Sequence, residues 1–286
     1  MTQSLRHSTP AESFSSSNLS GVREFNIDQF EDDVLACKEM NQHNLNKEKL
    51  QRIHPDVLVN YNSLNVLCGP QGSGKTFSAC KEIAKISQID KHAHLLVIIC
   101  KPENQDDPTV NTFIPLINIP IEYVIESDAE DYVKNLFEYK RLYNTIKEQH
   151  LEDRIADSQR DELFQTLHIN DFSREWLHTM IMINDSAKCG LLKSGSYFSQ
   201  LVAIGRHTQT STFLNIQFWK GLSPEIKANI SSAFIFGLFS RQQLVHILSQ
   251  LPSQYDYKEI YEVYRTLSKR DKMIFTNGQI DLEIKS

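Results

Sequence analysis

The stretch that decides the fold reads Gly69-Pro70-Gln71-Gly72-Ser73-Gly74-Lys75-Thr76. It matches the pattern G-x-x-x-x-G-K-[ST], follows an apolar run and opens a segment with helical periodicity, which is the context that this motif requires. Glycines let the backbone N–H groups point inward, and the helix adds its positive N-terminal end, so the loop suits phosphate groups. We therefore expect ATP here, with Lys75 on the β- and γ-phosphates and the Thr76 hydroxyl on Mg²⁺.

A second nucleotide motif is indicated by the apolar residues 180–183, which run into Asn184-Asp185. A carboxylate at the end of a buried strand faces the same crevice as the phosphate loop, where it can hold Mg²⁺ or polarise the attacking water. Two registers are open. If Asn184 takes the metal position, Asp185 is the catalytic acid. If Asp185 takes the metal position, Ser186 follows it and the base is missing.

Two more residues are candidates for the reaction. Gln217 closes the apolar run 212–216, where it could sense the γ-phosphate, or simply cap the strand end as an amide. Arg206 precedes that run and could neutralise charge on the transferring phosphate as an arginine finger. The alternative for Arg206 is an ordinary surface position.

Apolar runs alternate with helically patterned segments along the chain. Such alternation implies an α/β fold, a mainly parallel sheet with helices on both faces. The predicted architecture is a RecA-like P-loop NTPase core with an additional strand between the two nucleotide motifs. We expect strands at 64–68, 95–100, 122–125, 180–183, 212–216, 233–239 and 273–276, and helices at 76–86, 128–150, 152–167, 197–204, 241–251 and 257–267, with a short helix after residue 223.

The domain organisation follows from composition. With 286 residues, 40% of them hydrophobic, the chain can bury one sizeable core. Residues 1–22 are serine-rich and are expected to form a flexible tail, and residues 23–60 a helical extension. Residues 61–286 form the P-loop ATPase domain. Within it, the charged segment 128–167 reads as a helical insertion with a solvated face, or alternatively as a contact for a polymer substrate or a neighbouring subunit.

Charge and cysteine usage narrow the class of protein. A net charge of −6 argues against a broadly basic surface, although a local basic strip could still bind duplex DNA. The five cysteines show no C-x-x-C spacing and are expected to be reduced core residues. No apolar run reaches the roughly 18 residues that span a bilayer, and serines stand where a signal peptide has its apolar core. We therefore expect a soluble, non-secreted protein with no membrane partner.

The motifs together resemble the genome-packaging ATPases of the HerA/FtsK superfamily. The resemblance is carried by the phosphate loop, by the strand ending Asn184-Asp185, and by Gly205-Arg206-His207 followed by the run 212–217. The nearest branch is the poxvirus-type packaging ATPase of large eukaryotic DNA viruses, virophages and polinton-like elements. The similarity covers about residues 60–250.

The resemblance implies roles for individual residues. It assigns a γ-phosphate sensor to Gln217 and an arginine finger to Arg206. The family's second motif normally ends in two acidic residues, and Asn184 departs from it at the first. That leaves Asp185 as the catalytic acid and implies a weakened Mg²⁺ site or slow hydrolysis, unless Thr76 and bound waters suffice.

The resemblance also implies partners and a place of action. It implies a homo-oligomeric ring, a hexamer or pentamer, that hydrolyses ATP at subunit interfaces and pumps double-stranded DNA into a preformed capsid. The partner would be the capsid or its portal vertex. The protein would be located in the host cytoplasm, at the viral factory, or in the virion. The loop 188–195 carries Lys188 and Lys193, which suit contact with a phosphate backbone.

Other functions remain open at this point. A DNA helicase or conjugation-type pump would share every nucleotide residue. A nucleotide-binding assembly switch or scaffold with little hydrolysis is favoured by Asn184, whereas Lys75, Asp185 and Gln217 together count against it. A small-molecule kinase is a further option, but the sequence has no arginine-rich lid and no second phosphate-binding loop.

Overall fold

The computed structural model describes residues 59, 61–184, 190–204, 208–237, 239–251, 257–276 and 279–283. They all belong to the second of two compact units, Glu48–Ser286. The predicted tail at 1–22 lies outside the described residues, as does the extension at 23–60 except for Val59. Asp185 and Arg206 also lie outside them.

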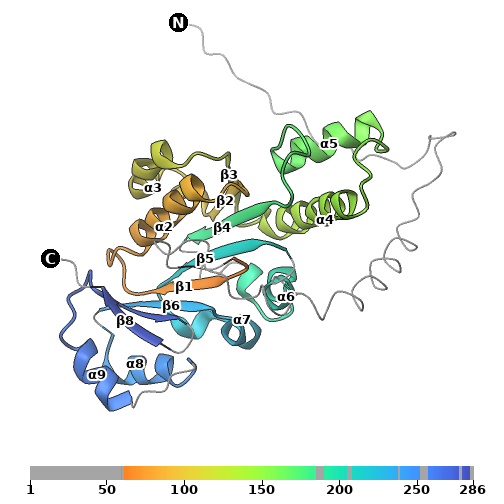
Figure 1. Cartoon of the computed structure of the whole chain (residues 1–286). Coiled ribbons are helices and arrows are strands. Elements are labelled where there is room, and N and C mark those ends of the chain that lie inside the picture. Colours follow the sequence, from red (N-terminus) through yellow and green to blue (C-terminus); the bar gives the residue numbers. More distant parts are fainter. Residues whose placement is uncertain are drawn as a thin grey trace, which may run out of the picture. The chain divides into compact units, whose positions relative to one another are not determined.

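The described strands form one sheet in the order β3-β2-β4-β5-β1-β6-β7-β8 (Figure 1). Neighbouring strands from β3 to β6 are parallel, and β7 and β8 add an antiparallel edge. Strand β5 lies between β1 and β4, which confirms the additional strand predicted between the two nucleotide motifs. The bounds are β1 Leu64–Cys68, β2 Ala93–Cys100, β3 Ile121–Ile125, β4 His178–Asn184, β5 Thr210–Ile216, β6 Ser232–Phe236, β7 Lys272–Thr276 and β8 Gln279–Glu283.

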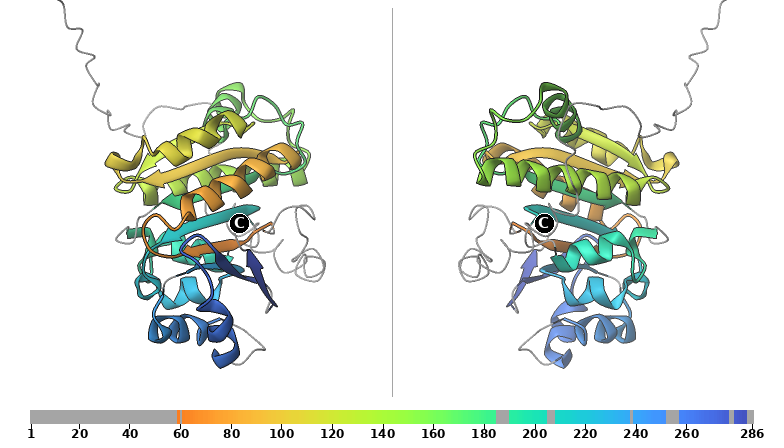
Figure 2. Two further views of the ribbon diagram at one scale, coloured as in Figure 1. Left: turned by 90° about the vertical axis from the view of Figure 1, so that its left-hand side faces the viewer. Right: turned by 90° about the vertical axis from the view of Figure 1, so that its right-hand side faces the viewer.

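Helices cover both faces of this sheet (Figure 2). Helices α2 and α3 pack on one face, and α4 packs on the other. The described helices are α2 Lys75–Ile89, α3 Pro108–Phe113, α4 Ala129–Glu148, α5 Asp157–Leu167, α6 Tyr197–Ile204, α7 Pro224–Ala228, α8 Arg241–Leu248 and α9 Tyr257–Tyr264. This mainly parallel α/β architecture confirms the predicted fold class.

Two hydrophobic clusters, one on each face of the sheet, form the core. Side chains along a strand alternate between faces, so a strand in the middle of a covered sheet feeds both clusters. In β2, Leu95, Val97 and Ile99 belong to one cluster, and Leu96 and Ile98 belong to the other. This is why the central strands are unbroken apolar runs in the sequence.

Helix α4 is the main element of the charged segment that the sequence singled out. Its apolar side, which includes Val133, Leu136, Phe137 and Ile146, is buried in the core cluster. Only the opposite side is solvated. Helix α4 is therefore an amphipathic helix that covers the sheet, and the solvated face expected from its charges is one of its two sides.

Several details differ from the sequence-based expectations. Helix α5 begins at Asp157, not at 152, and helices α8 and α9 each end three residues earlier than expected. The short elements α3 and β8 were not predicted. The strand expected at 233–239 ends at Phe236. The Gly237 N–H still donates to the carbonyl oxygen of Asp271, its partner in the β6–β7 register, at 3.1 Å, but the Asp271 N–H does not return the bond and donates to the Ser268 carbonyl oxygen at 3.2 Å. The region 101–108, expected to be a loop, contains a 3₁₀ turn at Pro102–Asn104 and ends at the first residue of α3.

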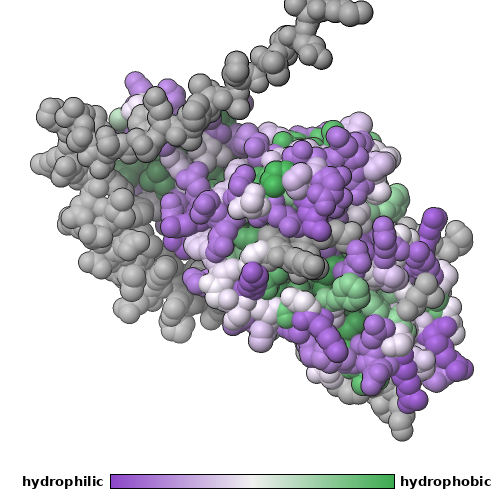
Figure 3. All heavy atoms as spheres, turned by 180° about the vertical axis from the view of Figure 1, so that it is seen from behind, coloured by the Kyte–Doolittle hydropathy of each residue, from purple (hydrophilic) through white to green (hydrophobic). Residues whose placement is uncertain are grey.

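The cysteines and the surface agree with a globular domain. Cys68, Cys80 and Cys100 are buried free thiols, and Cys37 and Cys189 lie outside the described residues. None of the helices in the described ranges combines the length and apolar character needed to cross a lipid bilayer. The face seen in Figure 3 is largely hydrophilic, with smaller hydrophobic patches between the polar residues.

Candidate active site

The phosphate loop connects β1 to α2 at the carboxyl end of the parallel strands. Gly72 and Gly74 have φ angles of 72° and 94°, in the left-handed region that favours glycine. At Gly69 the constraint is space, because an added Cβ would lie 2.7 Å from the Cβ of Phe236. The glycines of the motif therefore allow a tight loop that side chains would prevent.

The loop wraps around the first residue of α2, Lys75. The buried Nζ of Lys75 donates to the carbonyl oxygens of Gly69 and Pro70, at 3.0 Å each. The Ser73 hydroxyl is buried and lacks a hydrogen-bond partner within the described part of the chain. The Lys75 ammonium and the Ser73 hydroxyl, at the start of α2, make a donor set that suits phosphate oxygens.

Gln217 lies beside the start of this loop. The Gly69 N–H donates to the carbonyl oxygen of Ile216 at 3.2 Å, and Ile216 is the last residue of β5. Gln217 follows directly and is half-buried. The structure thus brings Gln217 and the phosphate loop together, as the sequence predicted, and its sensing role stays a prediction.

Asn184, at the end of β4, contacts the threonine of the phosphate loop. The Thr76 hydroxyl donates to Asn184 Oδ1 at 3.2 Å, and Asn215 Nδ2 donates to the same oxygen at 3.1 Å. Asn184 is 3% exposed. Of the two registers left open by the sequence, this contact favours the one with Asn184 at the metal position. Asp185, the acid of that register, lies outside the described residues, so its role stays a prediction.

A carboxylate that the sequence analysis missed lies next to Asn184. Asp107 Oδ1 caps α3 by accepting from the N–H groups of Thr109 at 2.7 Å and Val110 at 3.3 Å. Its other oxygen, Oδ2, accepts from Asn184 Nδ2 at 3.5 Å. The signal was the step Asp107-Pro108 after a central strand, an N-cap residue followed by proline at the first helical position.

A cation from the C-terminal part of the domain lies over the loop. An added Cβ at Gly72 would be 3.3 Å from the Nζ of Lys269. The turn that carries Lys269 is fixed, because the Ser268 N–H donates to Asp271 Oδ2 at 2.7 Å. No local sequence signal links Lys269 to the loop, since the two meet only through the order of β1, β6 and β7 in the sheet.

The thiol that precedes the loop is not a reactive group. Burial raises the pKa of Cys68 to about 12, against the opposing effect of the Lys75 ammonium. Cys68 is therefore a neutral thiol at physiological pH, in agreement with the core role expected for it.

The loop proposed to contact DNA lies only partly within the described residues. Lys188 and Cys189 lie outside them. Gly190–Leu192 form a 3₁₀ turn that buries Leu191 and Leu192 in the core, while Lys193 is exposed. The described part of this segment is thus anchored at its leucines and presents Lys193 to solvent.

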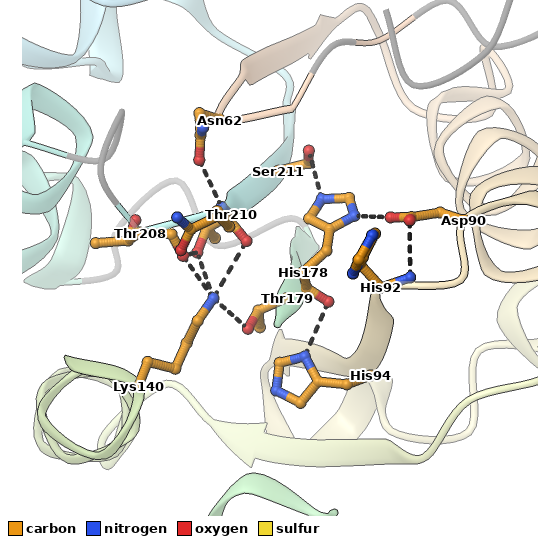
Figure 4. A network of polar contacts seen from close by, with 11 residues as sticks. Asn62, Asp90, His92, His94, Lys140, His178, Thr179, Thr208, Thr210 and Ser211 are labelled. Atoms are coloured by element: carbon orange, nitrogen blue, oxygen red, sulfur yellow. Dashed lines mark hydrogen bonds and ion pairs between the residues drawn. The ribbon is translucent and has the colours of Figure 1, made fainter. Parts of the chain in front are cut away.

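A second polar cluster lies at the amino-terminal ends of β2, β4 and β5, opposite the strand ends that carry the phosphate loop (Figure 4). His178 connects Asp90 to Ser211: its Nδ1 donates to Asp90 Oδ2 at 2.6 Å, and its Nε2 accepts from the Ser211 hydroxyl at 2.9 Å. This order of groups resembles a hydrolase triad. However, His178 and Ser211 have no exposed surface, so no substrate can reach the hydroxyl and the array is structural.

Lys140 belongs to the same polar edge. It projects from α4 toward the starts of β4 and β5 (Figure 4). Its Nζ donates to Thr179 Oγ1 at 2.8 Å and to the carbonyl oxygens of Thr208 at 2.5 Å and Gln209 at 3.1 Å. Burial lowers the pKa of Lys140 well below its usual value. These contacts fix α4 against the sheet.

Comparisons with known proteins support the fold. A scan against protein-family models and a search of curated proteins found no match. The crystal structure of B204, the DNA-packaging ATPase from Sulfolobus Turreted Icosahedral Virus, is similar with a TM-score of 0.50 at 13% identity, covering 80% of this chain and 100% of that one. EssC (ATPases 2 and 3) from Geobacillus thermodenitrificans gives a TM-score of 0.49 at 10% identity, covering 78% of this chain and 39% of that one. The likeness to B204 confirms the RecA-like P-loop fold that the order of strands, helices and nucleotide motifs predicted.

Proposed function

We propose that this protein is an ATPase that drives double-stranded viral DNA into a preformed capsid. The observation that carries the nucleotide part is the phosphate loop around Lys75, with Thr76 in contact with the end of β4. In a parallel sheet, ligands bind at the carboxyl ends of the strands, and these residues all lie there.

Each residue of the site has a distinct task in this proposal. The loop N–H groups and Lys75 bind the phosphates, and Thr76 and Asn184 offer oxygens to Mg²⁺. When bound, Mg²⁺ would offset the negative charge of the β- and γ-phosphates. Asp185 would accept a proton from the attacking water, and Gln217 would respond to loss of the γ-phosphate.

The residues present fit a magnesium ion by the chemistry of their donors. Mg²⁺ takes oxygen ligands at about 2.1 Å in an octahedron, so adjacent ligand oxygens lie about 3 Å apart. The hydroxyl oxygen of Thr76 and Oδ1 of Asn184 are 3.2 Å apart. Both are oxygens, and an acidic side chain is within hydrogen-bond distance of Asn184.

The DNA part of the proposal rests on the motif resemblance and on the fold shared with a protein described as a DNA-packaging ATPase. In this reading the chain forms a homo-oligomeric ring, and Arg206 of one subunit reaches the nucleotide of its neighbour. The partner of this ring is the viral capsid or its portal vertex. The ring acts in the host cytoplasm or in the virion. Lys193 is exposed and could contact the DNA backbone.

The test is steady-state ATP hydrolysis by the purified full chain with Mg²⁺, with and without linear double-stranded DNA. We expect turnover that DNA stimulates and that the Lys75→Ala variant loses by at least about 100-fold, because the lysine holds the transferring phosphate. Hydrolysis in the Lys75→Ala protein equal to wild type would contradict the proposal.

A second candidate function is a nucleotide-binding assembly switch. It is favoured by Asn184, whose amide brings no charge to the metal position. ATP binding without turnover, with or without DNA, would support the switch over the motor.

A further inference from the structure

We propose that Asp107 supplies the carboxylate of the magnesium site, in place of the acidic residue that position 184 lacks. The proposal rests on the nucleotide binding proposed above and names a residue of the same site. In this proposal Asp107 is a metal-site residue that comes from the loop after β2. The second nucleotide motif, in contrast, has its acidic residue at the end of β4.

The first argument is position in the sheet. Strand β2 lies directly beside β4, and Ile99 of β2 pairs with Ile183 of β4. The loop that follows β2 is therefore delivered to the end of β4, next to the phosphate loop. Asp107 in that loop reaches Asn184, which in turn reaches Thr76.

The second argument is how Asp107 is held. One carboxylate oxygen, Oδ1, is bound by two backbone N–H groups at the start of α3. This fixes the side chain, while Oδ2 points to the nucleotide site through its contact with Asn184. One oxygen of this carboxylate is already fixed, and the other faces the nucleotide site. The side chain therefore loses little conformational entropy when a cation binds there.

The third argument is the orientation of the Asn184 amide. Two donors, the Thr76 hydroxyl and Asn215 Nδ2, both point at Asn184 Oδ1. The amide nitrogen is thereby turned to Asp107, to which it donates. An aspartate at 184 would instead place two carboxylates side by side, which repel each other. Asparagine at 184 thus complements a negative charge that is located at 107.

Neighbouring acids do not fit the same role. Asp106 is exposed, and none of its interactions involves Asn184 or Thr76 in the described part of the chain. Asp106 is therefore a matched control, because Asp106→Asn makes the same change of charge one residue away.

The experiment measures binding rather than turnover. The dissociation constant of AMPPCP for the purified full chain is determined by calorimetry, once with Mg²⁺ and once with EDTA. The constant in EDTA divided by the constant in Mg²⁺ gives the coupling between metal and nucleotide. In Asp107→Asn we expect this ratio to fall by at least roughly 10-fold, because the site loses its carboxylate, and even the loss of an outer partner of a bound metal has an effect of that size. Binding in EDTA should be unchanged or tighter, because a charge that repels phosphate is gone.

Two further variants make the result specific. Asp106→Asn should keep the wild-type ratio. The double variant Asp107→Asn with Asn184→Asp should recover most of it, because the charge returns at the neighbouring position. Asparagine also caps helices well, so α3 should remain folded in Asp107→Asn, which thermal unfolding verifies.

The outcomes separate the two proposals. A wild-type ratio in Asp107→Asn, or an equal fall in Asp106→Asn, would overturn the role of Asp107. A folded double variant that recovers nothing would overturn it too. Failure of the wild-type chain to bind AMPPCP under either condition would instead overturn the proposed function itself.

Discussion

At the scale of single residues, Gly237 shows how tightly the C-terminal turn is packed against the end of β6. A Cβ at this position would lie 2.2 Å from the Ser268 carbonyl oxygen, which is backbone and cannot rotate away. We expect Gly237→Ala to lower the free energy of unfolding by about 3 kcal/mol, since overpacking forces the backbone to shift. Urea unfolding followed by circular dichroism measures it.

Gly190→Ala is the control for this change. Within the described part of the chain, an added Cβ there meets nothing within 4 Å, so we expect a change of no more than about 0.5 kcal/mol. Equal effects of the two substitutions would show that the contact with Ser268 is not what makes a side chain at position 237 destabilising.

The residues of the site differ in how far the sequence reveals them. Thr76 and Lys75 belong to a local motif, whose spacing alone predicts the loop. Asn215 and Asp107 have no motif, and they reach the site only because β5 and β2 flank β4 in the sheet. Sequence reasoning placed Gln217 correctly beside the loop because it closes a strand, but it could not see the amide and carboxylate that surround Asn184.

At the scale of elements, Lys140 fixes α4 to the starts of β4 and β5. Lys140→Met keeps most of the side-chain volume but removes the donor that Lys140 supplies to Thr179, Thr208 and Gln209. The carbonyl oxygens of Thr208 and Gln209 keep other donors, the Thr210 hydroxyl and the Thr179 N–H, so the loss is that of the lysine's own bonds. We expect a loss of about 1 to 2 kcal/mol in unfolding free energy, because removing a buried hydrogen-bond donor breaks the network around it. Lys134→Met, at an exposed position of the same helix, should change stability by less than about 0.5 kcal/mol. Similar losses in both variants would contradict the role of Lys140 in fixing α4.

The buried histidines at the same edge predict a pH dependence of stability. Burial lowers the pKa of His94 well below its ordinary value of 6.5, and it also lowers that of His178. Below pH 6.5 the unfolded chain takes up protons that the folded chain does not, so stability is full above this pH and falls below it. His94 should contribute a loss of about 1 kcal/mol between pH 6.5 and 5.5, and His178 should add a loss in the same direction.

Urea unfolding at several pH values tests this dependence. The His94 ring donates through Nδ1 to the His178 carbonyl oxygen at 2.9 Å, a bond that an asparagine amide can replace. His94→Asn should therefore flatten the fall in stability below pH 6.5, whatever its effect at neutral pH. An unchanged slope would exclude His94 as one of its sources.

Most elements could be predicted because apolar runs and helical periodicity are local signals. The runs at 64–68 and 95–100 correspond to β1 and β2, since strands covered on both faces are continuously apolar. Helix α3 has only six residues, too few for a periodicity to show, and β8 is an edge strand with partly exposed residues. Short elements of this kind are defined by their tertiary contacts, which the sequence pattern does not contain.

At the scale of the whole molecule, the proposed ring makes each active site depend on two subunits. The described residues of one chain supply the phosphate loop, the contact of Thr76 with Asn184, and Gln217 beside the loop. The remaining cation of the proposal, Arg206, would come from a neighbour. A site divided in this way has a consequence that a single-chain site does not have, since two differently damaged subunits can complement each other.

Mixing of two inactive variants tests that division. Lys75→Ala removes the phosphate-binding lysine, and Arg206→Ala removes the proposed finger, so each variant alone should hydrolyse ATP very slowly. In a ring assembled from equal amounts of both, about one interface in four joins an intact Lys75 to an intact Arg206, if subunits mix at random. We therefore expect DNA-stimulated hydrolysis to recover to about a quarter of the wild-type rate after joint refolding or exchange. If Arg206 instead serves the nucleotide of its own subunit, every site in the mixture lacks one group and no activity returns.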